Sequence, residues 1–419
     1  MGTLSRKNKF HPKKLLLNPI AFFFVSIIYR KVRAVSIVIY STIETARTYF
    51  KLIEPLYAYM KVLSAISDPV FTGREYNRFD RFFLQYIKDE RDLPFIYLTI
   101  RISLILIPLS VLLFMPFLTG WAWWVVAVVH FGFSNFGIKG PFGLMLHCTS
   151  HRQFFKSEYG WMNNYLPWIL APLFGHTPET YYSHHIGMHH PENNLEDDDS
   201  STMTYQRDSV RSFIAYFGRF FVVGVRNLLG YLRKKNRSKL ATRAFAGEMI
   251  FGVVCIALCF VSWPAVIAVF VFPLFIYRLI AMVGNWTQHS FVDGEDPGNA
   301  YKNSLTCINV NYNKKCWNDG YHISHHVRPG MHWSEHPTFF LKTIDKYAQN
   351  QAIVFDGLDF GNVFFLLMRG RYDILAQHMV NINGTFANDE EAIALLRRRT
   401  KRIPFRTESL TMANVAVAA

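Results

Sequence analysis

Residues 181–200 read YYSHHIGMHHPENNLEDDDS, a stretch with four imidazoles within seven residues followed by a run of carboxylates. The whole chain has only 16 histidines in 419 residues, so this density is far above chance. On an α-helix His185 and His189 share a face because they are four residues apart, whereas His190 is turned by about 100° from His189 and can reach a second ion. The stretch therefore predicts one part of a metal site whose other ligands come from elsewhere in the chain.

The composition indicates a protein that crosses a membrane several times. Hydrophobic residues make up 51% of the chain and aromatic residues 16%, and the mean hydropathy is positive. Four apolar runs approach the roughly 20 residues that a helix needs to cross a bilayer, and they form two pairs: residues 94–120 with 121–138, and 244–262 with 263–284. We expect an all-α membrane protein with four transmembrane helices in two hairpins, with interfacial helices and a cytosolic, histidine-rich helical cap.

The formal net charge of +15 is unevenly distributed along the chain. The expected hairpin turns at 118–121 and 261–264 contain no Lys or Arg, whereas the N-terminal segment, residues 139–243 and the C-terminal tail are rich in both. The positive-inside rule therefore places both termini on the cytosolic side of a multi-pass protein. An endoplasmic reticulum membrane and a bacterial or organellar membrane fit equally well. No nucleic-acid-binding motif accompanies the charge, so contact with anionic lipid is expected instead.

This topology divides the chain into three expected regions. They are an N-terminal cytosolic or interfacial region (1–93), a membrane domain (94–345) and a C-terminal cytosolic tail (346–419). Residues 1–43 contain no Asp or Glu, which favours an amphipathic helix on the bilayer; an organellar transit peptide is the alternative. Residues 213–230 are apolar but include Arg219 and Arg226, which favours a surface helix over a fifth span. The five cysteines include no Cys-x-x-Cys pair, which argues against a disulfide framework and a thiolate zinc site.

Two further segments have histidines at helical spacing close to the ends of the expected spans. His147 and His151 are four residues apart, and His322, His325 and His326 lie at positions i, i+3 and i+4. Neutral imidazole is a suitable ligand for iron, copper or zinc. The last span ends in the sequence NWTQH, which carries Asn285 and His289.

Some neighbouring residues compete with this set or could support it. His184 offers an alternative spacing to His189, and we favour His185 as the ligand. His130, within the second span, is expected to be structural, and His336 a hydrogen-bonding side chain of the cap. Possible additional ligands or supporting residues are His176, Asp319, His332 and Glu335.

The three histidine segments, in this order and beside paired spans, resemble the integral-membrane fatty-acid desaturase and hydroxylase superfamily over residues 94–337. The resemblance implies a non-haem diiron centre with Asn285 holding one iron through a water. The implied histidine ligands are His147, His151, His185, His189, His190, His289, His322, His325 and His326. A ligand set made almost wholly of imidazole would leave the irons strongly oxidising, as abstraction of hydrogen from an unactivated methylene requires. Nearby carboxylates could accept the second ring N–H of these histidines and fix their orientation.

We therefore expect an O2-dependent lipid desaturase that contains two iron ions and introduces a double bond into an acyl chain. Hydroxylation is the main alternative, because it begins with the same hydrogen abstraction. The haem motif of cytochrome b5, His-Pro-Gly-Gly, is absent from the sequence, so the electrons must come from a separate carrier of the cytochrome b5 or ferredoxin type. A metal transporter is a remote alternative, because only His130 would lie inside a span. The motifs leave the acyl chain length, the position of the double bond and the head group open.

Overall fold

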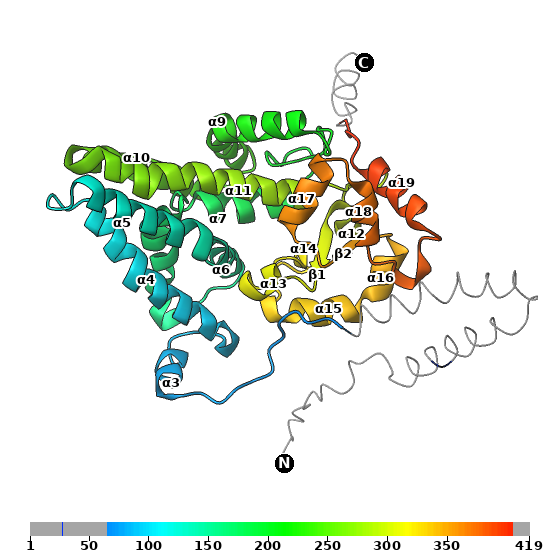
Figure 1. Ribbon diagram of the computed structural model, residues 1–419, viewed down its shortest axis with the longest axis horizontal. Coiled ribbons are helices and arrows are strands. Elements are labelled where there is room, and N and C mark those ends of the chain that lie inside the picture. Colours follow the sequence, from blue (N-terminus) through cyan, green and yellow to red (C-terminus); the bar gives the residue numbers. More distant parts are fainter. Residues whose placement is uncertain (1–26, 28–64, 405–419) are drawn as a thin grey trace, which may run out of the picture.

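The computed structural model of the protein describes Ile27 and residues 65–404, and it is mostly helical (Figure 1). Apart from Ile27, the expected N-terminal amphipathic helix lies outside the described residues. Short elements outside the two hairpins and the site are α3 (Arg78–Leu84), the 3₁₀ helices Glu90–Asp92, Ser157–Asn164, Ala171–Phe174, Trp333–Glu335 and Ile382–Gly384, and a π-helical turn, Leu166–Leu170. The apolar stretch 161–175 is divided into short pieces, and Pro167 and Pro172 each lie in the first turn of one of them.

The first hairpin consists of α4 (Leu93–Leu113) and α5 (Gly120–Gly132). Pro94 lies in the first turn of α4, where a missing N–H breaks no helical hydrogen bond. Gly120 begins α5 at φ +60°, a left-handed conformation that favours glycine. The indole of Trp123 donates to the carbonyl oxygen of Leu113 at 3.0 Å and ties the two helices together.

The second hairpin consists of α10 (Ser238–Val266), a π-helical turn (Ile267–Val271) and α11 (Phe272–Gln288). These elements follow one another without a gap, but Ser262 has an extended backbone (φ −160°, ψ 98°) that reverses the chain. The reversal brings the ring of Phe251 in α10 to 6.1 Å from that of Phe270, measured between centroids. The apolar run is therefore folded into two antiparallel arms.

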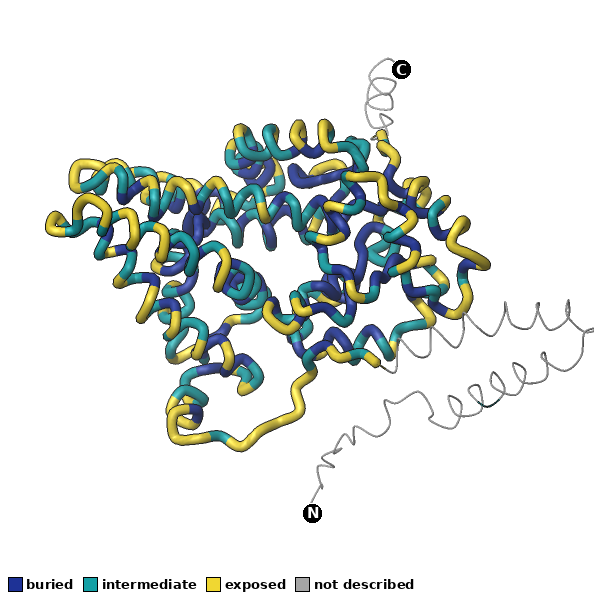
Figure 2. The backbone as a smooth tube through the Cα atoms, in the orientation of Figure 1, coloured by how far each residue is buried: buried dark blue, intermediate teal, exposed yellow. Residues whose placement is uncertain are grey.

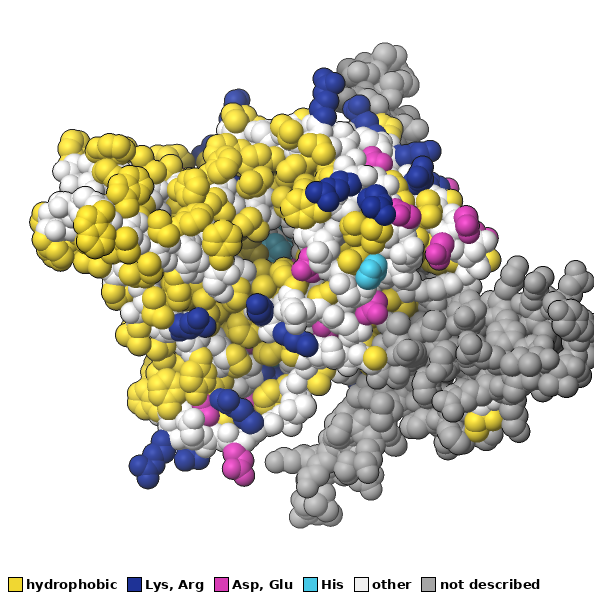
Figure 3. Space-filling view, viewed as in Figure 1, with side chains coloured by type: hydrophobic (Ala, Val, Ile, Leu, Met, Phe, Trp, Pro, Cys, Tyr) yellow, Lys and Arg dark blue, Asp and Glu magenta, His cyan; other side chains and the backbone are white. Residues whose placement is uncertain are grey.

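Within the part of the chain that the structure describes, three helical stretches have the length and composition of membrane spans. They are Glu90–Leu113, Val210–Lys234 and Ser238–Gln288; a bent pair, Gly120–Gly137 with Lys139–His151, could form a fourth, with a 53° bend between its members. The two hairpins expose large apolar side chains, with Trp121 80% and Phe260 89% exposed. At the end of the molecule formed by α4, α5 and α10, many residues are exposed (yellow in Figure 2) and the surface is largely hydrophobic (yellow in Figure 3). Such a surface suits lipid rather than water.

Helix α9 (Val210–Lys234) also has the composition of a span, although its arginines predicted a surface helix. Its polar side chains contact the loop that follows the second histidine segment. Arg219 forms an ion pair with Asp199 at 2.9 Å, and Asn227 donates to the same carboxylate at 2.7 Å. The helix therefore covers this loop.

Residues 289–404, here called the cap, follow α11. The cap contains α12 (Ala300–Asn303), β1 (Leu305–Ile308), α13 (Asn311–Lys315), α14 (His322–Val327), α15 (His336–Lys342), α16 (Ile344–Gln349), β2 (Ile353–Asp356), α17 (Phe360–Met368), α18 (Tyr372–Gln377) and α19 (Asp389–Arg399). Strands β1 and β2 pair in parallel, with Leu305 opposite Ile353 and Ile308 opposite Asp356. This two-stranded sheet was not anticipated from the sequence.

The chain beyond residue 345 packs against the rest of the cap and against the loop that precedes α9. Strand β2 pairs with β1, and the guanidinium of Arg207 donates to the carbonyl oxygens of Arg399 and Lys401 at 2.9 and 2.5 Å. Arg399 lies in the basic run at 397–402, a pattern that usually indicates a solvated surface. Its side chain is buried and donates to Asp293 at 3.0 Å.

Candidate metal centre

Nine histidines from four separate parts of the chain converge. They come from α6 (Lys139–His151), from the segment that follows α7 (Thr180–His184), from the residue after α11, and from α14. They form two clusters, and within each cluster one ring nitrogen of every histidine lies within 4.8 Å of the others. The five-histidine cluster contains His147, His151, His185, His190 and His325. The four-histidine cluster contains His189, His289, His322 and His326. These are the nine histidines predicted from the sequence, and the structure brings all of them together.

A π-helical turn, His185–His189, decides how the second histidine segment is shared between the clusters. The backbone N–H of His190 bonds to the carbonyl oxygen of His185, five residues earlier. His185 therefore faces the same centre as His190, with 3.0 Å between their Nε2 atoms, while His189 faces the other cluster. The α-helical pairing of His185 with His189 that the sequence suggested is wrong for this reason. The helical segment ends with α8 (His190–Glu192), directly after this turn.

The five-histidine cluster directs Nε2 atoms at a common point. His147 and His325 approach to 3.0 Å between their Nε2 atoms, His151 and His185 to 2.9 Å, and His325 and His190 to 2.9 Å. Each imidazole offers either one lone pair or one N–H at its Nε2 atom. These close Nε2 contacts therefore cannot all be good hydrogen bonds. A cation at the centre would turn them into ligands, which fits the chemistry of this donor set.

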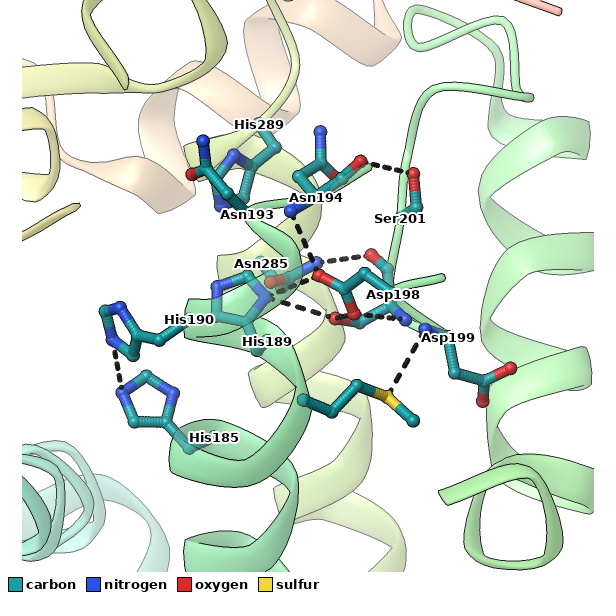
Figure 4. Close-up of polar contacts among 12 residues, drawn as sticks. His185, His189, His190, Asn193, Asn194, Asp198, Asp199, Ser201, Asn285 and His289 are labelled. Atoms are coloured by element: carbon teal, nitrogen blue, oxygen red, sulfur yellow. Dashed lines mark hydrogen bonds and ion pairs between the residues drawn. The ribbon is translucent and has the colours of Figure 1, made fainter. Parts of the chain in front are cut away.

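Two rings of the four-histidine cluster are held from outside by hydrogen bonds to the ring nitrogen that faces away from the cluster. His189 Nδ1 lies 2.8 Å from Asp198 Oδ2, and His289 Nδ1 lies 2.9 Å from the carbonyl oxygen of Asn303. Asp198, which faces His189 in Figure 4, also accepts from the backbone N–H and the hydroxyl of Ser200. Such contacts set the tautomer and leave Nε2 free for a metal. In the other cluster the corresponding contact is longer, 3.4 Å from His147 Nδ1 to Asp319 Oδ1.

The electrostatic setting favours neutral imidazoles and an ionised carboxylate. Burial, together with the neighbouring imidazoles, lowers the pKa of five cluster histidines well below the ordinary value: His185, His190, His322, His325 and His326. Burial likewise lowers the pKa of His289 to about 4. Burial opposes ionisation of Asp198, but His189 and Ser200 still hold the pKa of its carboxyl well below the usual range. Neutral imidazole is the form that binds metal.

Asn285 lies on α11 four residues before His289. Its Nδ2 donates to the carbonyl oxygen of Ser200 at 2.9 Å and to the hydroxyl of Tyr216 at 2.8 Å. These two hydrogen bonds of Nδ2 fix the orientation of the side-chain amide beside the four-histidine cluster.

The other histidines singled out in the sequence lie outside both clusters. His184 packs against Phe220, with 5.6 Å between ring centroids, and it is His185 that joins a cluster. His332 is bonded to Asp92 (3.0 Å), and His336 to Ser324 (2.7 Å), as expected for hydrogen-bonding side chains. The remaining residues named from the sequence also lie outside both clusters. His176 is buried but belongs to neither cluster, His130 bonds to Ser110, and Glu335 pairs with Arg91.

Two residues that support the four-histidine cluster, Asn303 and Asn194, had no recognisable signal in the sequence. Asn303 comes 14 residues after His289, and it contacts that ring through its backbone and its side chain. Its Oδ1 also accepts from Asn194, which holds the loop of Asp198. For Asp198 the acidic run was a signal of a carboxylate near the site, but the run did not distinguish Asp198 from its acidic neighbours.

An apolar cavity of about 390 Å³ leads to both clusters. It lies between α6, α7, α9 and α11, and His147, His185, His189 and His322 form part of its wall. Its volume is in the range of ligand-binding pockets. Figure 3 shows a hollow between the hydrophobic surface and the cap, with a histidine side chain visible at its bottom.

A model of the family described as "Fatty acid desaturase" matches residues 136–356. The matched segment contains all nine cluster histidines and Asn285. No curated protein and no solved structure matches the chain.

Proposed function

The chain belongs to the fatty acid desaturase family, since the matched segment covers more than half of it, and from this premise we propose that it is an O2-dependent desaturase of lipid acyl chains. Membership itself makes it an oxidoreductase of the desaturase and hydroxylase type, acting on fatty acyl chains in a membrane context. The family is known for iron-dependent catalysis. The observation that carries the proposal is the position of two histidine clusters at the wall of an apolar cavity.

The two clusters would hold two iron ions, one in each. Five imidazoles would bind the first ion; four imidazoles and a water held by Asn285 would bind the second. Support comes from the converging Nε2 atoms and from the outer partners Asp198 and Asn303, which orient His189 and His289. Bound iron would supply the O2-derived oxidant that removes hydrogen from an acyl chain.

The residues of the cavity would bind and align that chain. Apolar side chains of α9, including Phe220, Val225 and Leu228, form one wall and exclude water from an alkyl chain. His184 and Tyr181 also line the cavity, and this part of the wall reaches the five-histidine cluster because the ring of Tyr181 stacks on that of His185, with 5.3 Å between centroids. The position of the reacting methylene would be set by where the chain is held along this wall.

For the whole protein we propose four spans in two hairpins, with the cap and both termini in the cytosol and α9 on the membrane surface. The reversal at Ser262 and the exposed apolar tips of both hairpins support this topology. The membrane domain would end near residue 345, with residues 346–404 completing the cap. Electrons would come from a separate carrier of the cytochrome b5 or ferredoxin type, whose acidic surface the basic cytosolic side would attract.

Expression in a host without desaturases, followed by mass spectrometry of its lipids, tests the proposal. Desaturation lowers the mass of an acyl chain by two hydrogens, whereas hydroxylation adds one oxygen. The purified protein should contain two irons per chain. Metal flux without oxygen consumption, and no new lipid product, would contradict the proposal.

A further inference from the structure

The wall of the cavity contains two buried basic side chains that the metal centre does not use. Lys139 begins α6, just after the bend at Ile138, and His176 follows the short helix Ala171–Phe174. Both line the cavity, and Lys139 is 5% exposed and His176 2% exposed. We call this pair the Lys139–His176 pocket.

Lys139 has more donors than partners. Its ammonium group donates to the carbonyl oxygen of Phe174 at 2.7 Å, and within residues 65–404 it has no other hydrogen-bond partner. An ammonium group carries three N–H donors, and burial away from water makes unpaired donors costly. Phe174 is two residues before His176, so the bond also fixes Lys139 beside the imidazole.

His176 lacks a hydrogen-bond partner at both ring nitrogens. The ring lies on Tyr277, with 3.5 Å between centroids and 32° between planes, which accounts for its packing but not for its polarity. A neutral imidazole has one N–H to donate. Gly143, on the next turn of α6, faces the ring, since a Cβ there would lie 4.0 Å from His176 Nε2, in ordinary van der Waals contact.

The charge around this pocket is positive. Among the residues that line the cavity, Asp319 is the only carboxylate, and it lies beside His147 at the metal centre. The N-terminus of α6, with Lys139 and Gly140 in the cavity wall, adds the positive end of the helix dipole. Arg278, also in the wall, is paired with Glu248 at 3.7 Å. The pocket therefore favours a ligand with acceptor oxygens.

We propose that the Lys139–His176 pocket binds the carbonyl or carboxylate oxygens at the carboxyl end of the acyl substrate, with the alkyl chain running from there to the histidine clusters. The inference rests on the proposed function and names the group by which the substrate is recognised. An acceptor oxygen takes the free N–H groups of Lys139 and the N–H of His176, which are otherwise unpaired in an apolar cavity. A free fatty acid, a lipid ester and an acyl thioester all carry this chemistry.

The position of the pocket fixes from which end the reacting carbon is counted. Lys139 and His147 lie on the same helix, eight residues apart, or about 12 Å at the helical rise. If the carboxyl end is held at Lys139, the methylene beside the clusters stays at a constant number of carbons from it, whatever the length of the tail.

Binding to the full-length, iron-loaded protein in detergent tests the proposal. Radiolabelled stearic acid is the probe, with stearoyl-CoA, distearoyl phosphatidylcholine and the oxygen-free octadecane as competitors. Lys139→Met and His176→Phe should each weaken binding of stearic acid roughly tenfold to hundredfold, the effect of losing a charge-assisted hydrogen bond. Both variants should bind octadecane as the wild type does. His176→Phe keeps an aromatic ring on Tyr277, so it is the variant with the smaller structural change.

Lys156→Met is the matched control, because Lys156 also donates to a backbone carbonyl oxygen, that of Gln85, but lies outside the cavity. It should bind all probes as the wild type does. The competitor whose affinity depends on Lys139 identifies the source of the carboxyl group. Unchanged stearic acid binding in both variants, or an equal loss for octadecane, would overturn the proposal.

Product analysis separates this inference from the proposed function. With substrates of several chain lengths, the new double bond or hydroxyl should keep its distance from the carboxyl carbon, and Lys139→Met should scatter its position. A constant distance from the methyl end would contradict the inference while leaving the desaturase function intact. No product from any lipid, with stearic acid binding still dependent on Lys139, would contradict the function alone.

Discussion

The two histidine clusters differ in how their rings are held. The four-histidine cluster has fewer imidazoles but short outer contacts, 2.8 Å from His189 to Asp198 and 2.9 Å from His289 to the carbonyl oxygen of Asn303. The five-histidine cluster has more imidazoles, but its contact with a carboxylate, His147 to Asp319, is 3.4 Å long. The five-histidine site therefore relies on the number of its ligands, and the four-histidine site on the orientation of its rings. Each can therefore be weakened selectively.

The largest expected effect comes from two neighbouring residues of α14 that serve different clusters. His326→Ala leaves three imidazoles in its cluster, and His325→Ala leaves four in the other. We expect both to lower activity more than a hundredfold, because oxidation needs both irons. Only His326→Ala should lose a full iron per chain, since three imidazoles with an open site hold iron weakly. Iron analysis of the purified variants checks this.

His184→Gln is the control for these variants, since His184 lies in the cavity wall outside both clusters. It should keep two irons per chain. An equal loss of iron in all three variants would show that the clusters are not separate sites.

The next effect concerns the outer carboxylates. Asp198→Asn removes the charge that faces His189 but keeps the shape of the side chain. We expect iron affinity at the four-histidine cluster to fall roughly tenfold to hundredfold, as for other partners of this kind. Asp319→Asn should cost less, because its contact with His147 is longer. Competition with a chelator measures both, and a larger loss for Asp319→Asn would reverse the comparison.

The spacing of histidines along the sequence predicted which residues gather, but not how they divide. His147 and His151, four residues apart, lie in one cluster because α6 is a regular α-helix there, although their spacing alone left open whether they hold one ion or bracket two. His185 and His189 lie in different clusters, because the π-helical turn is a local adjustment that leaves no mark in the residue types. Asn303 was missed because its role depends on tertiary contact, and the shorter of its two contacts with His289 is through a backbone carbonyl, which any residue could supply.

The fold shows a similar division. Apolar runs and Pro94 predicted the hairpins, since burial in lipid depends on composition over a long window. The pairing of β1 with β2 could not be predicted, because two four-residue strands about 45 residues apart carry too little pattern. For the same reason the buried place of Arg399 was hidden within a basic run.

A pH dependence distinguishes the buried histidines from exposed ones. Burial lowers the pKa of His289 to about 4, below the ordinary value near 6.5. Between these values the unfolded chain binds a proton that the folded chain does not, so stability rises with pH across this window. The melting temperature of the metal-free protein should therefore fall as the pH is lowered from 6.5 toward 4. A melting temperature that stays constant over this range would contradict the burial of a neutral His289.

The smallest expected effect concerns the support of Asn285. Tyr216→Phe removes the hydroxyl that accepts from Asn285 and donates to the carbonyl oxygen of Ser200. The loss of these bonds should cost about 1 kcal/mol of stability, with both irons retained. Thermal unfolding checks the cost. Loss of an iron would instead mean that Asn285 depends on Tyr216 for its orientation.

Anomalous X-ray scattering at the iron edge, from crystals of the purified protein, tests the central claim most directly. Two peaks should appear, one among the Nε2 atoms of His147, His151, His185, His190 and His325, and one among those of His189, His289, His322 and His326. A single peak, or no iron between these rings, would contradict the account.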